Sequence, residues 1–150
     1  YERIWLMIGI VTLAVFLVLF GVMAVSMGLN PPGHHQTIDP NAVSATAPFD
    51  NPGIQEIGLG EYNVSIVARL FMFQPDTIQV PAGSKVHFQV TSPDVVHGLL
   101  IAGTNVNMMV VPGHVTQFTY TFKKPGDYLI VCNEYCGAGH QFMMGRIRVQ

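Results

Sequence analysis

Hydrophobic residues follow two different patterns along this chain, and the first is a long uninterrupted run. Residues 4–27 read IWLMIGIVTLAVFLVLFGVMAVSM and contain neither a charged residue nor a proline. About 20 apolar residues in a helix are enough to cross a bilayer core, and a somewhat longer helix does so with a slight tilt. We therefore predict a single transmembrane helix and assign residues 1–28 to a membrane anchor.

A cleaved signal peptide is the alternative interpretation of this run. The tripeptide Ala24-Val25-Ser26 resembles a cleavage site. The apolar part of a signal peptide, however, usually spans about 7–15 residues, and the run here is longer. Its length favours the membrane anchor.

The second pattern consists of short segments in which apolar and polar residues alternate. In residues 85–91, for example, Val86, Phe88 and Val90 share one face, which is typical of a β-strand. Further strands are predicted over residues 62–68, 116–122, 128–131 and 147–149. Gly/Pro turns separate these segments and no helical stretch occurs among them, which indicates an all-β antiparallel sandwich or barrel over residues 61–150.

Residues 29–60 lie between these two regions and show no sustained periodicity. They are rich in Pro, Gly, Asn and Ala. This composition is typical of turns and loops, so we predict a linker that runs over the surface.

Composition and charge narrow the class of protein and its orientation. Hydrophobic residues make up 49% of the chain and charged residues 11%, an apolar excess that the first segment explains. The net charge of −2 argues against nucleic acid as a partner and permits attraction to a basic protein. Arg3 precedes the apolar run, and no Lys or Arg follows it until Arg69. The positive-inside bias therefore predicts an extracytoplasmic β-domain.

The two cysteines of the chain lie in one short stretch together with other metal-binding side chains. Residues 132–143 read CNEYCGAGHQFM. A disulfide between Cys132 and Cys136 is compatible with an oxidising compartment, but it would close a very small loop and restrain the unfolded chain little. A zinc site would use the cysteines, His140 and one remote histidine, yet has no use for Met143. A copper chaperone with this cysteine spacing would need a thioredoxin-like fold with alternating helices, which are absent here.

Copper electron transfer uses every one of these residues. Cys136, His140, Met143 and the upstream His97 make up a blue-copper ligand set of one thiolate, two imidazoles and a weak thioether. Cys132 adds a second thiolate, which can bridge two coppers jointly with the first. Each copper then takes one imidazole, while Met143 and a loop carbonyl between the cysteines serve as weak ligands.

Two stretches together closely resemble subunit II of the haem–copper oxidases, the electron-entry subunit of cytochrome c oxidase. They are residues 92–97, SPDVVH, and residues 132–143. The resemblance covers nearly the whole chain, and the single helix is most similar to the compact B-family, ba-type subunit. It implies a cupredoxin-like Greek-key sandwich preceded by one transmembrane helix.

The resemblance also implies a ligand set for a binuclear copper centre, CuA. Its side-chain ligands would be His97, Cys132, Cys136, His140 and Met143, and Glu134 would bind through its backbone carbonyl. Met144 is a competing thioether, but the spacing of the motif favours Met143. The carboxylate of Glu134 would be a ligand for Mg at the contact with subunit I, a site that a second chain would complete.

Electron entry is the point at which the sequence departs from the family. Many members have a surface tryptophan near the copper, whereas the single tryptophan here is Trp5 in the apolar run. Phe71 and Phe73 lie at the matching position, and they form either an apolar docking patch or part of the core. Asp94 is either a docking acid, a residue that supports a ligand, or the cap of a turn after Pro93.

The function implied by the resemblance is electron transfer within a larger enzyme. The chain would accept electrons from cytochrome c and pass them to haem in subunit I, for oxygen reduction coupled to proton pumping. It would be a single-pass protein of a prokaryotic plasma (inner) membrane. The chain offers no nucleophile–base pair or phosphate loop for catalysis of its own. The alternatives are the CuA subunit of a nitric oxide reductase and a membrane-anchored copper carrier without an oxidase.

Overall fold

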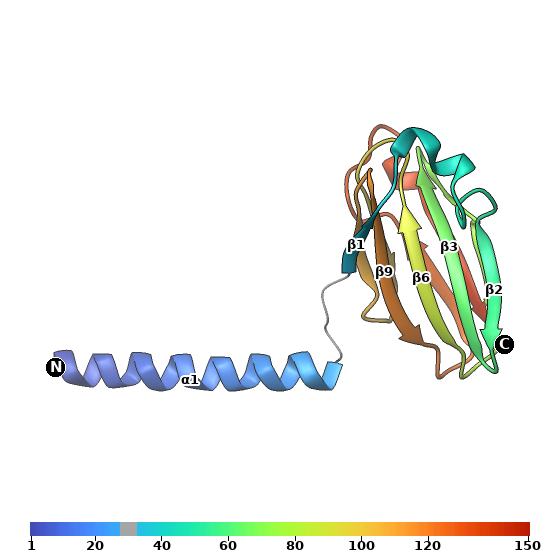
Figure 1. The fold of residues 1–150 in the computed structure, drawn as a ribbon. Helices are drawn as coiled ribbons and strands as arrows, with labels where there is room; N and C mark the ends of the chain where they lie inside the picture. The colour runs from blue at the N-terminus through green and yellow to red at the C-terminus, as the bar shows by residue number, and fades with distance from the viewer. Residues whose placement is uncertain (28–32) are drawn as a thin grey trace. The chain divides into compact units, whose positions relative to one another are not determined.

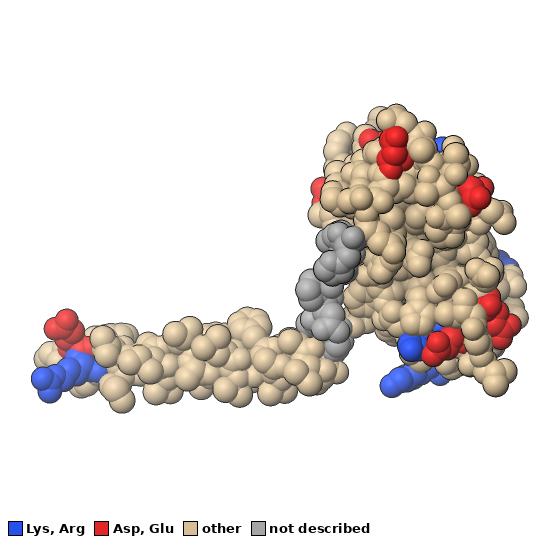
Figure 2. All heavy atoms as spheres, in the orientation of Figure 1, with Lys and Arg blue, Asp and Glu red and all other residues tan. Residues whose placement is uncertain are grey.

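The N-terminal part of the chain is one long helix. The computed structural model of the protein describes residues 1–27 and 33–150. The helix α1 (Glu2–Met27) has 26 residues, so it is about 39 Å long and exceeds the roughly 30 Å of a bilayer core. All of its described side chains are exposed, and Figure 2 shows charged atoms only at its N-terminal end. Its length and composition allow it to cross a membrane, as predicted.

The remainder of the chain is a sandwich of two β-sheets. Contacts within the chain divide it into two units, Tyr1–Pro31 and Pro32–Gln150. The first sheet, sheet A, has the strand order β1-β9-β6-β3-β2, with β4 paired to β3 (Figure 1). Its strands are β1 (Gly33–Thr37), β2 (Gly53–Gly58), β3 (Glu61–Arg69), β4 (Met72–Gln74), β6 (Lys85–Thr91) and β9 (His114–Thr121).

The second sheet, sheet B, has the strand order β5-β11-β10-β7-β8. Its strands are β5 (Thr77–Val80), β7 (His97–Ile101), β8 (Asn107–Val110), β10 (Gly126–Val131) and β11 (Met144–Val149). Most pairs in both sheets are antiparallel, but β3 pairs with β6 and β11 with β5 in parallel. The sandwich is therefore mainly antiparallel, as predicted, with one parallel strand pair in each sheet.

The core lies between the two sheets and follows the alternation of side chains along the strands. Val86, Phe88 and Val90 are at most 1% exposed, as the predicted face of residues 85–91 requires. Phe122 packs edge-on against Phe88 of sheet A and against Tyr128 of sheet B, with ring centroids 6.3 and 5.1 Å apart. These aromatic contacts join the two layers.

The predicted linker, residues 29–60, contains regular structure; its residues 29–32 lie outside the described part of the chain. The structure places β1, the 3-10 helix η1 (Pro40–Ala45) and β2 within this range. Ile38, Val43 and Phe49 form a small buried cluster with Val67 and Val115 of sheet A. Periodicity misses this segment because its apolar residues are widely spaced and become buried only through contact with distant strands.

All five strands predicted from alternation are present, with ends that differ by a few residues. Residues 85–91 coincide with β6, and the other four segments overlap β3, β9, β10 and β11. The strands that alternation did not predict outside the supposed linker are β4, β5, β7 and β8, which have three to five residues each. Segments this short leave too few positions for a period of two to be recognised.

Candidate metal centre

The loop that carries the two cysteines is an excursion between paired strands. β10 and β11 are antiparallel neighbours, and Val131 lies opposite Met144 at the end of the pair. The amide of Cys132 donates to the carbonyl of Met143 over 3.2 Å, which continues the pairing by one step. The residues at the two ends of the loop are thereby held side by side.

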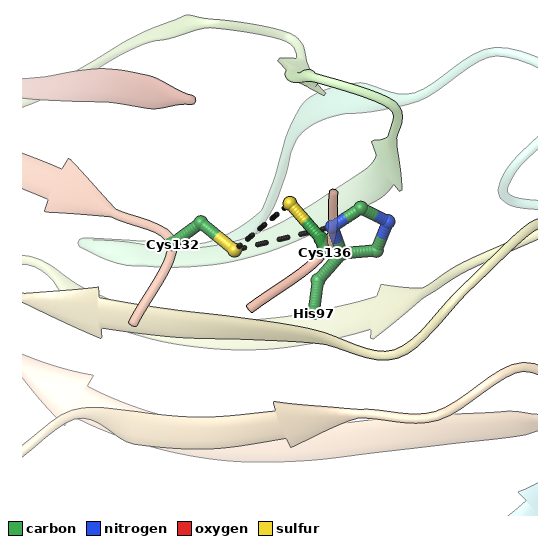
Figure 3. Close-up of side chains that lie close together, drawn as sticks. All are labelled: His97, Cys132 and Cys136. Atoms are coloured by element: carbon green, nitrogen blue, oxygen red, sulfur yellow. Dashed lines mark hydrogen bonds between the residues drawn. The ribbon is translucent and has the colours of Figure 1, made fainter. Parts of the chain in front are cut away.

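His97 reaches this loop from a different strand. It is the first residue of β7, which pairs with β10 through Val131 and Leu100. The His97 ring is fully buried. Among the described residues, His97, Cys132 and Cys136 are the one group of three His, Cys, Asp or Glu side chains placed to hold a metal ion, with ligand atoms within 4.8 Å of one another. Figure 3 shows the two sulfurs and the imidazole turned toward one another.

The other predicted donors complete the cluster. The Sγ atoms of Cys132 and Cys136 are 3.8 Å apart, and the Nδ1 of His97 is 3.9 Å from the sulfur of Cys132. The sulfur of Cys136 has two further neighbours, the His140 Nδ1 at 3.6 Å and the Met143 Sδ at 3.8 Å. The carbonyl oxygen of Glu134 lies 3.2 Å from the Cys132 sulfur.

These separations suit donors around metal ions. Two sulfurs that each lie about 2.3 Å from a metal, at tetrahedral angles, are about 3.8 Å apart. A disulfide requires an S–S distance of about 2.05 Å, and both cysteines are free in this structure. A four-ligand zinc site would use the cysteines and histidines and would leave the Met143 thioether and the Glu134 carbonyl without a role. Two soft-metal ions that share the sulfurs use all six donors.

The three sulfur atoms of the cluster are shielded from water. Cys132 and Cys136 are 7% and 6% exposed, and Met143 is 2% exposed. Burial, together with hydrogen bonding and repulsion from Cys132, raises the pKa of the Cys136 thiol to about 11. Without a metal, the thiol is therefore protonated at neutral pH. Met144 is 52% exposed, so its sulfur does not compete with that of Met143.

Asp94 orients the imidazole of His97. The Nε2 of His97 lies 2.8 Å from the Asp94 carboxylate, which leaves Nδ1 on the side of the sulfurs. The same carboxylate accepts hydrogen bonds from the Leu70 amide, the Val95 amide and the Ser92 hydroxyl. Burial raises the pKa of Asp94, but these hydrogen bonds outweigh it and the net pKa is lowered. Asp94 is therefore ionised at neutral pH and joins a ligand to the loop at Leu70.

Phe71 covers the outer side of the cysteine loop. Its ring packs so closely that a Cβ at Gly139 would overlap it, and a Cβ at Gly137 would lie 3.1 Å from it. Gly137 also has a φ of +130°, which few other residues adopt. The glycines of the CGAGH motif therefore allow an aromatic ring to lie directly against the ligand loop.

The three predicted docking residues have different positions. Phe71 is half-buried against the loop, and Asp94 contacts a predicted ligand. Phe73 is 2% exposed and belongs to the hydrophobic core, so its prediction as a docking residue is wrong. Adjacent positions on a strand point to opposite sides, and β4 turns the Phe73 side chain inward between exposed Met72 and Gln74.

Sequence reasoning missed residues that hold the loop from the side of β7. Gly98 lies against the Asn133 side chain and the Glu134 amide nitrogen, and the Asn133 side chain donates to Asn107 over 3.0 Å. A glycine inside a strand pattern often marks close approach of another backbone. That signal was available at Gly98, directly after His97.

Comparisons with known proteins agree on one family. A profile of the periplasmic domain of cytochrome c oxidase subunit II matches residues 58–149. The chain is 41% identical to a cytochrome c oxidase subunit 2 of Thermus thermophilus, over all of this chain and 92% of the relative.

Solved structures extend the likeness to the fold. A subunit of a haem–copper terminal oxidase dimer, solved by cryo-EM, superposes with a TM-score of 0.83 and 34% identity over 99% of both chains. The periplasmic domain of subunit II of the cytochrome oxidase of Bradyrhizobium japonicum has a TM-score of 0.55 at 22% identity. It covers 59% of this chain and 83% of that domain, and this likeness concerns the cupredoxin-like fold alone.

The family match, the full-length relative and the sandwich with its buried Cys and His cluster lead to one conclusion: this chain belongs to the subunit II family of cytochrome c oxidase, a haem–copper terminal oxidase.

Proposed function

We propose that this chain is the electron-entry subunit of its oxidase and that it holds a binuclear CuA centre. The supporting observation is the cluster of six donors, in which two unlinked thiols lie 3.8 Å apart, each with an imidazole beside it. His97, Cys132, Cys136, His140 and Met143 would bind through side chains and Glu134 through its carbonyl. Such a copper pair supplies one-electron transfer, with the electron shared between both ions.

The chain's own groups prepare this site in three ways. The buried sulfurs exclude water from the place where charge changes, which limits solvent rearrangement during electron transfer. Asp94 holds His97 in one orientation and places Nδ1 on the side of the metal. The hydrogen bond between Cys132 and Met143 keeps both ends of the loop together before any metal arrives.

Electron entry is assigned to the surface formed by Phe71 and its neighbours. Leu70 and Met72 are 46% and 56% exposed, and the Phe71 ring lies against the ligand loop. The Leu70 amide also donates to Asp94, which contacts His97, so a short bonded path leads from this surface to a ligand. An apolar surface lets the haem edge of a donor such as cytochrome c approach closely, with few charges to desolvate.

The remaining assignments concern partners and location. Electrons would leave toward haem in subunit I, from the side of His140, where Tyr135 and Phe142 are 75% and 72% exposed. The helix α1 would anchor the chain in a prokaryotic plasma (inner) membrane in a single pass, with the β-sandwich on the periplasmic side. Oxygen reduction and proton pumping would take place in the partner subunit.

The carboxylate of Glu134 is proposed as a ligand for Mg at the contact with subunit I. Its side chain is partly exposed beside the loop, and its carbonyl faces the sulfurs. Glu134 would thus contact Mg through its carboxylate and copper through its backbone carbonyl. Replacing it in the complex, Glu134→Gln, should lower the Mg content and leave the copper content unchanged, because the carbonyl belongs to the backbone.

Copper analysis of the intact chain tests the central proposal. We expect two coppers per chain and an electron paramagnetic resonance (EPR) spectrum in which one unpaired electron couples equally to two copper nuclei. Cys136→Ser should abolish this shared signal, while Met144→Leu should preserve it. Zinc, or a single copper per chain, would refute the proposal. Turnover assays of the copurified complex with oxygen and with nitric oxide would test the reductase alternative, which the relatives do not favour.

A further inference from the structure

The backbone between the two cysteines crosses the outer face of β7. Leu99 and Ile101 point into the core between the sheets. Because side chains alternate along a strand, Gly98 and Leu100 face outward. After Val131, the last residue of β10 to pair with β7, the chain continues over this outward face at Gly98.

Gly98 is the residue that makes this crossing possible. A Cβ at this position would overlap the Oδ1 of the Asn133 side chain, and it would lie 3.0 Å from the Asn133 Cγ and 2.9 Å from the Glu134 amide nitrogen. Real Cβ atoms essentially never approach other atoms below 3.0 Å, and a backbone atom cannot turn aside as a side-chain tip can. Any larger residue at Gly98 therefore has to displace the Asn133 side chain and shift the backbone at Glu134.

A hydrogen bond ties the loop backbone that crosses β7 to the neighbouring strand β8. β8 is the edge strand that follows β7 in sheet B, and its Asn107 lies opposite Leu100. The Asn133 Nδ2 donates to the Asn107 Oδ1 over 3.0 Å. The Asn133 side chain thus spans β7 from the β10 side to β8 and ties the loop down over Gly98.

We propose that Gly98, Asn133 and Asn107 form a loop clamp that positions the carbonyl of Glu134 at the copper pair. This inference deepens the proposed function and rests on it. The carbonyl oxygen of Glu134 lies 3.2 Å from the Cys132 sulfur. The clamp contacts Asn133, the residue directly before Glu134, and the amide nitrogen of Glu134 itself.

The clamp determines how evenly the two coppers share an electron. A weak oxygen ligand stabilises the oxidised form of the copper it contacts, because oxygen is a harder donor than sulfur. When the clamp opens, the carbonyl withdraws from one copper and leaves the other unaffected. The electron is then shared unequally, and the reduction potential of the centre rises.

Four variants of the full-length chain separate the clamp from general packing effects. Gly98→Ala forces the loop away from β7, and Asn107→Ala removes the acceptor of the Asn133 hydrogen bond at an exposed position. Asn107→Asp keeps an acceptor at the same place and serves as the rescue variant. Gly53→Ala is the matched control, because a Cβ there meets nothing within 4 Å.

Three measurements are made on each variant, two on the copper-loaded chain and one on the copper-free chain. In the copper-loaded chain, EPR and redox titration report the sharing of the electron and the potential. We expect Gly98→Ala to give unequal coupling and to shift the equilibrium with a one-electron donor about tenfold, or about 59 mV, toward the reduced centre. Asn107→Ala should shift it in the same direction by a smaller factor. Asn107→Asp should keep the wild-type coupling, because it keeps the acceptor, and Gly53→Ala should match the unmodified chain in both coupling and potential.

In the copper-free chain, the rate at which Cys132 reacts with a thiol reagent reports opening of the loop. We expect a several-fold increase for Asn107→Ala and a larger one for Gly98→Ala. Wild-type coupling, potential and thiol rate in Asn107→Ala would overturn the clamp, even if Gly98→Ala fails to fold. Absence of a shared copper signal in the unmodified chain would instead overturn the proposed function. Failure of the clamp and failure of the proposed function therefore give different results.

Discussion

At the scale of single residues, the thiol of Cys136 shows how the protein environment prepares a proposed metal ligand. Burial raises its pKa to about 11, yet copper binds the thiolate. The metal therefore has to displace a proton. Loss of that proton is unfavourable in the copper-free chain and becomes favourable when the metal compensates the charge.

Copper uptake should consequently release protons and strengthen with pH. Because the Cys136 thiol is protonated below about pH 11, each proton displaced should raise the apparent affinity for Cu(I) roughly tenfold per pH unit. Competition titrations of the reduced chain at several pH values would measure this slope, and Cys136→Ser should lower it. An affinity independent of pH between about pH 6 and pH 9 would contradict the expectation.

The neighbouring aromatics Phe71 and Phe73 should differ sharply in the effect of their removal. Phe73 is 2% exposed, so Phe73→Ala should lower the free energy of unfolding by about 3–5 kcal/mol. Phe71 is half-buried against the ligand loop. Phe71→Ala should therefore cost less stability and mainly slow electron transfer from the proposed donor, cytochrome c.

Denaturant unfolding measures the loss of stability in both variants, and stopped-flow reduction measures their rates of electron transfer. Tyr128→Ala is a control for the loss of a partly buried ring away from the cluster, and it should leave the rate of reduction unchanged. Equal rates of reduction for Phe71→Ala and the unmodified chain would remove Phe71 from the entry surface.

At the scale of elements, β11 joins the loop that carries the two cysteines to the rest of sheet B. It follows Met143 directly, pairs with β10 on one side and runs parallel to β5 on the other. The Arg146 amide donates to the Asp76 carbonyl over 2.7 Å where β5 begins. A Cβ at Gly145 would lie 2.8 Å from that same carbonyl oxygen.

Gly145→Ala should therefore destabilise the sandwich without removing a ligand. Overpacking of this kind typically costs about 1–3 kcal/mol, because the contacting atom belongs to the backbone. Denaturant unfolding of the copper-free chain would measure the loss, with Gly58→Ala as the control, since a Cβ there meets its nearest neighbour at 3.9 Å. Equal stability of the two variants would show that β5 and β11 separate at little cost.

At the scale of the whole molecule, the chain combines an apolar helix with a sandwich that has its own core. The two units, Tyr1–Pro31 and Pro32–Gln150, each have their own internal contacts. The buried cluster of hydrophobic side chains belongs entirely to the second unit. Charged side chains are sparse on the face of the sandwich seen in Figure 2, in keeping with a charged content of 11%.

Removal of residues 1–27 should therefore give a domain that dissolves without detergent and keeps the proposed copper centre. All six proposed donors lie in the second unit, and the helix contributes none. The EPR spectrum and copper content of the truncated and full-length chains would be compared. Loss of the shared copper signal on truncation would show that the helix supports the fold of the site.

Local sequence determined the chemistry of the site. The motif CNEYCGAGHQFM contains five of the six proposed donors within one loop, so their proximity required no knowledge of the fold. Alternation predicted the central strands because their inward positions are mostly apolar. Residues 4–27 predicted α1 because an uninterrupted apolar run of this length is itself a local signal of a long apolar helix.

Tertiary structure alone decided which residues surround those donors. It placed Phe71 on the loop and Phe73 in the core, and it made strands of residues assigned to a linker. It also brought Gly98 against the Glu134 amide and Asn107 into hydrogen bonding with the Asn133 side chain. These are contacts between strands that lie far apart in the sequence. Their energies depend on the packing of one strand against another, and a linear pattern of polar and apolar residues carries no record of which strands will meet.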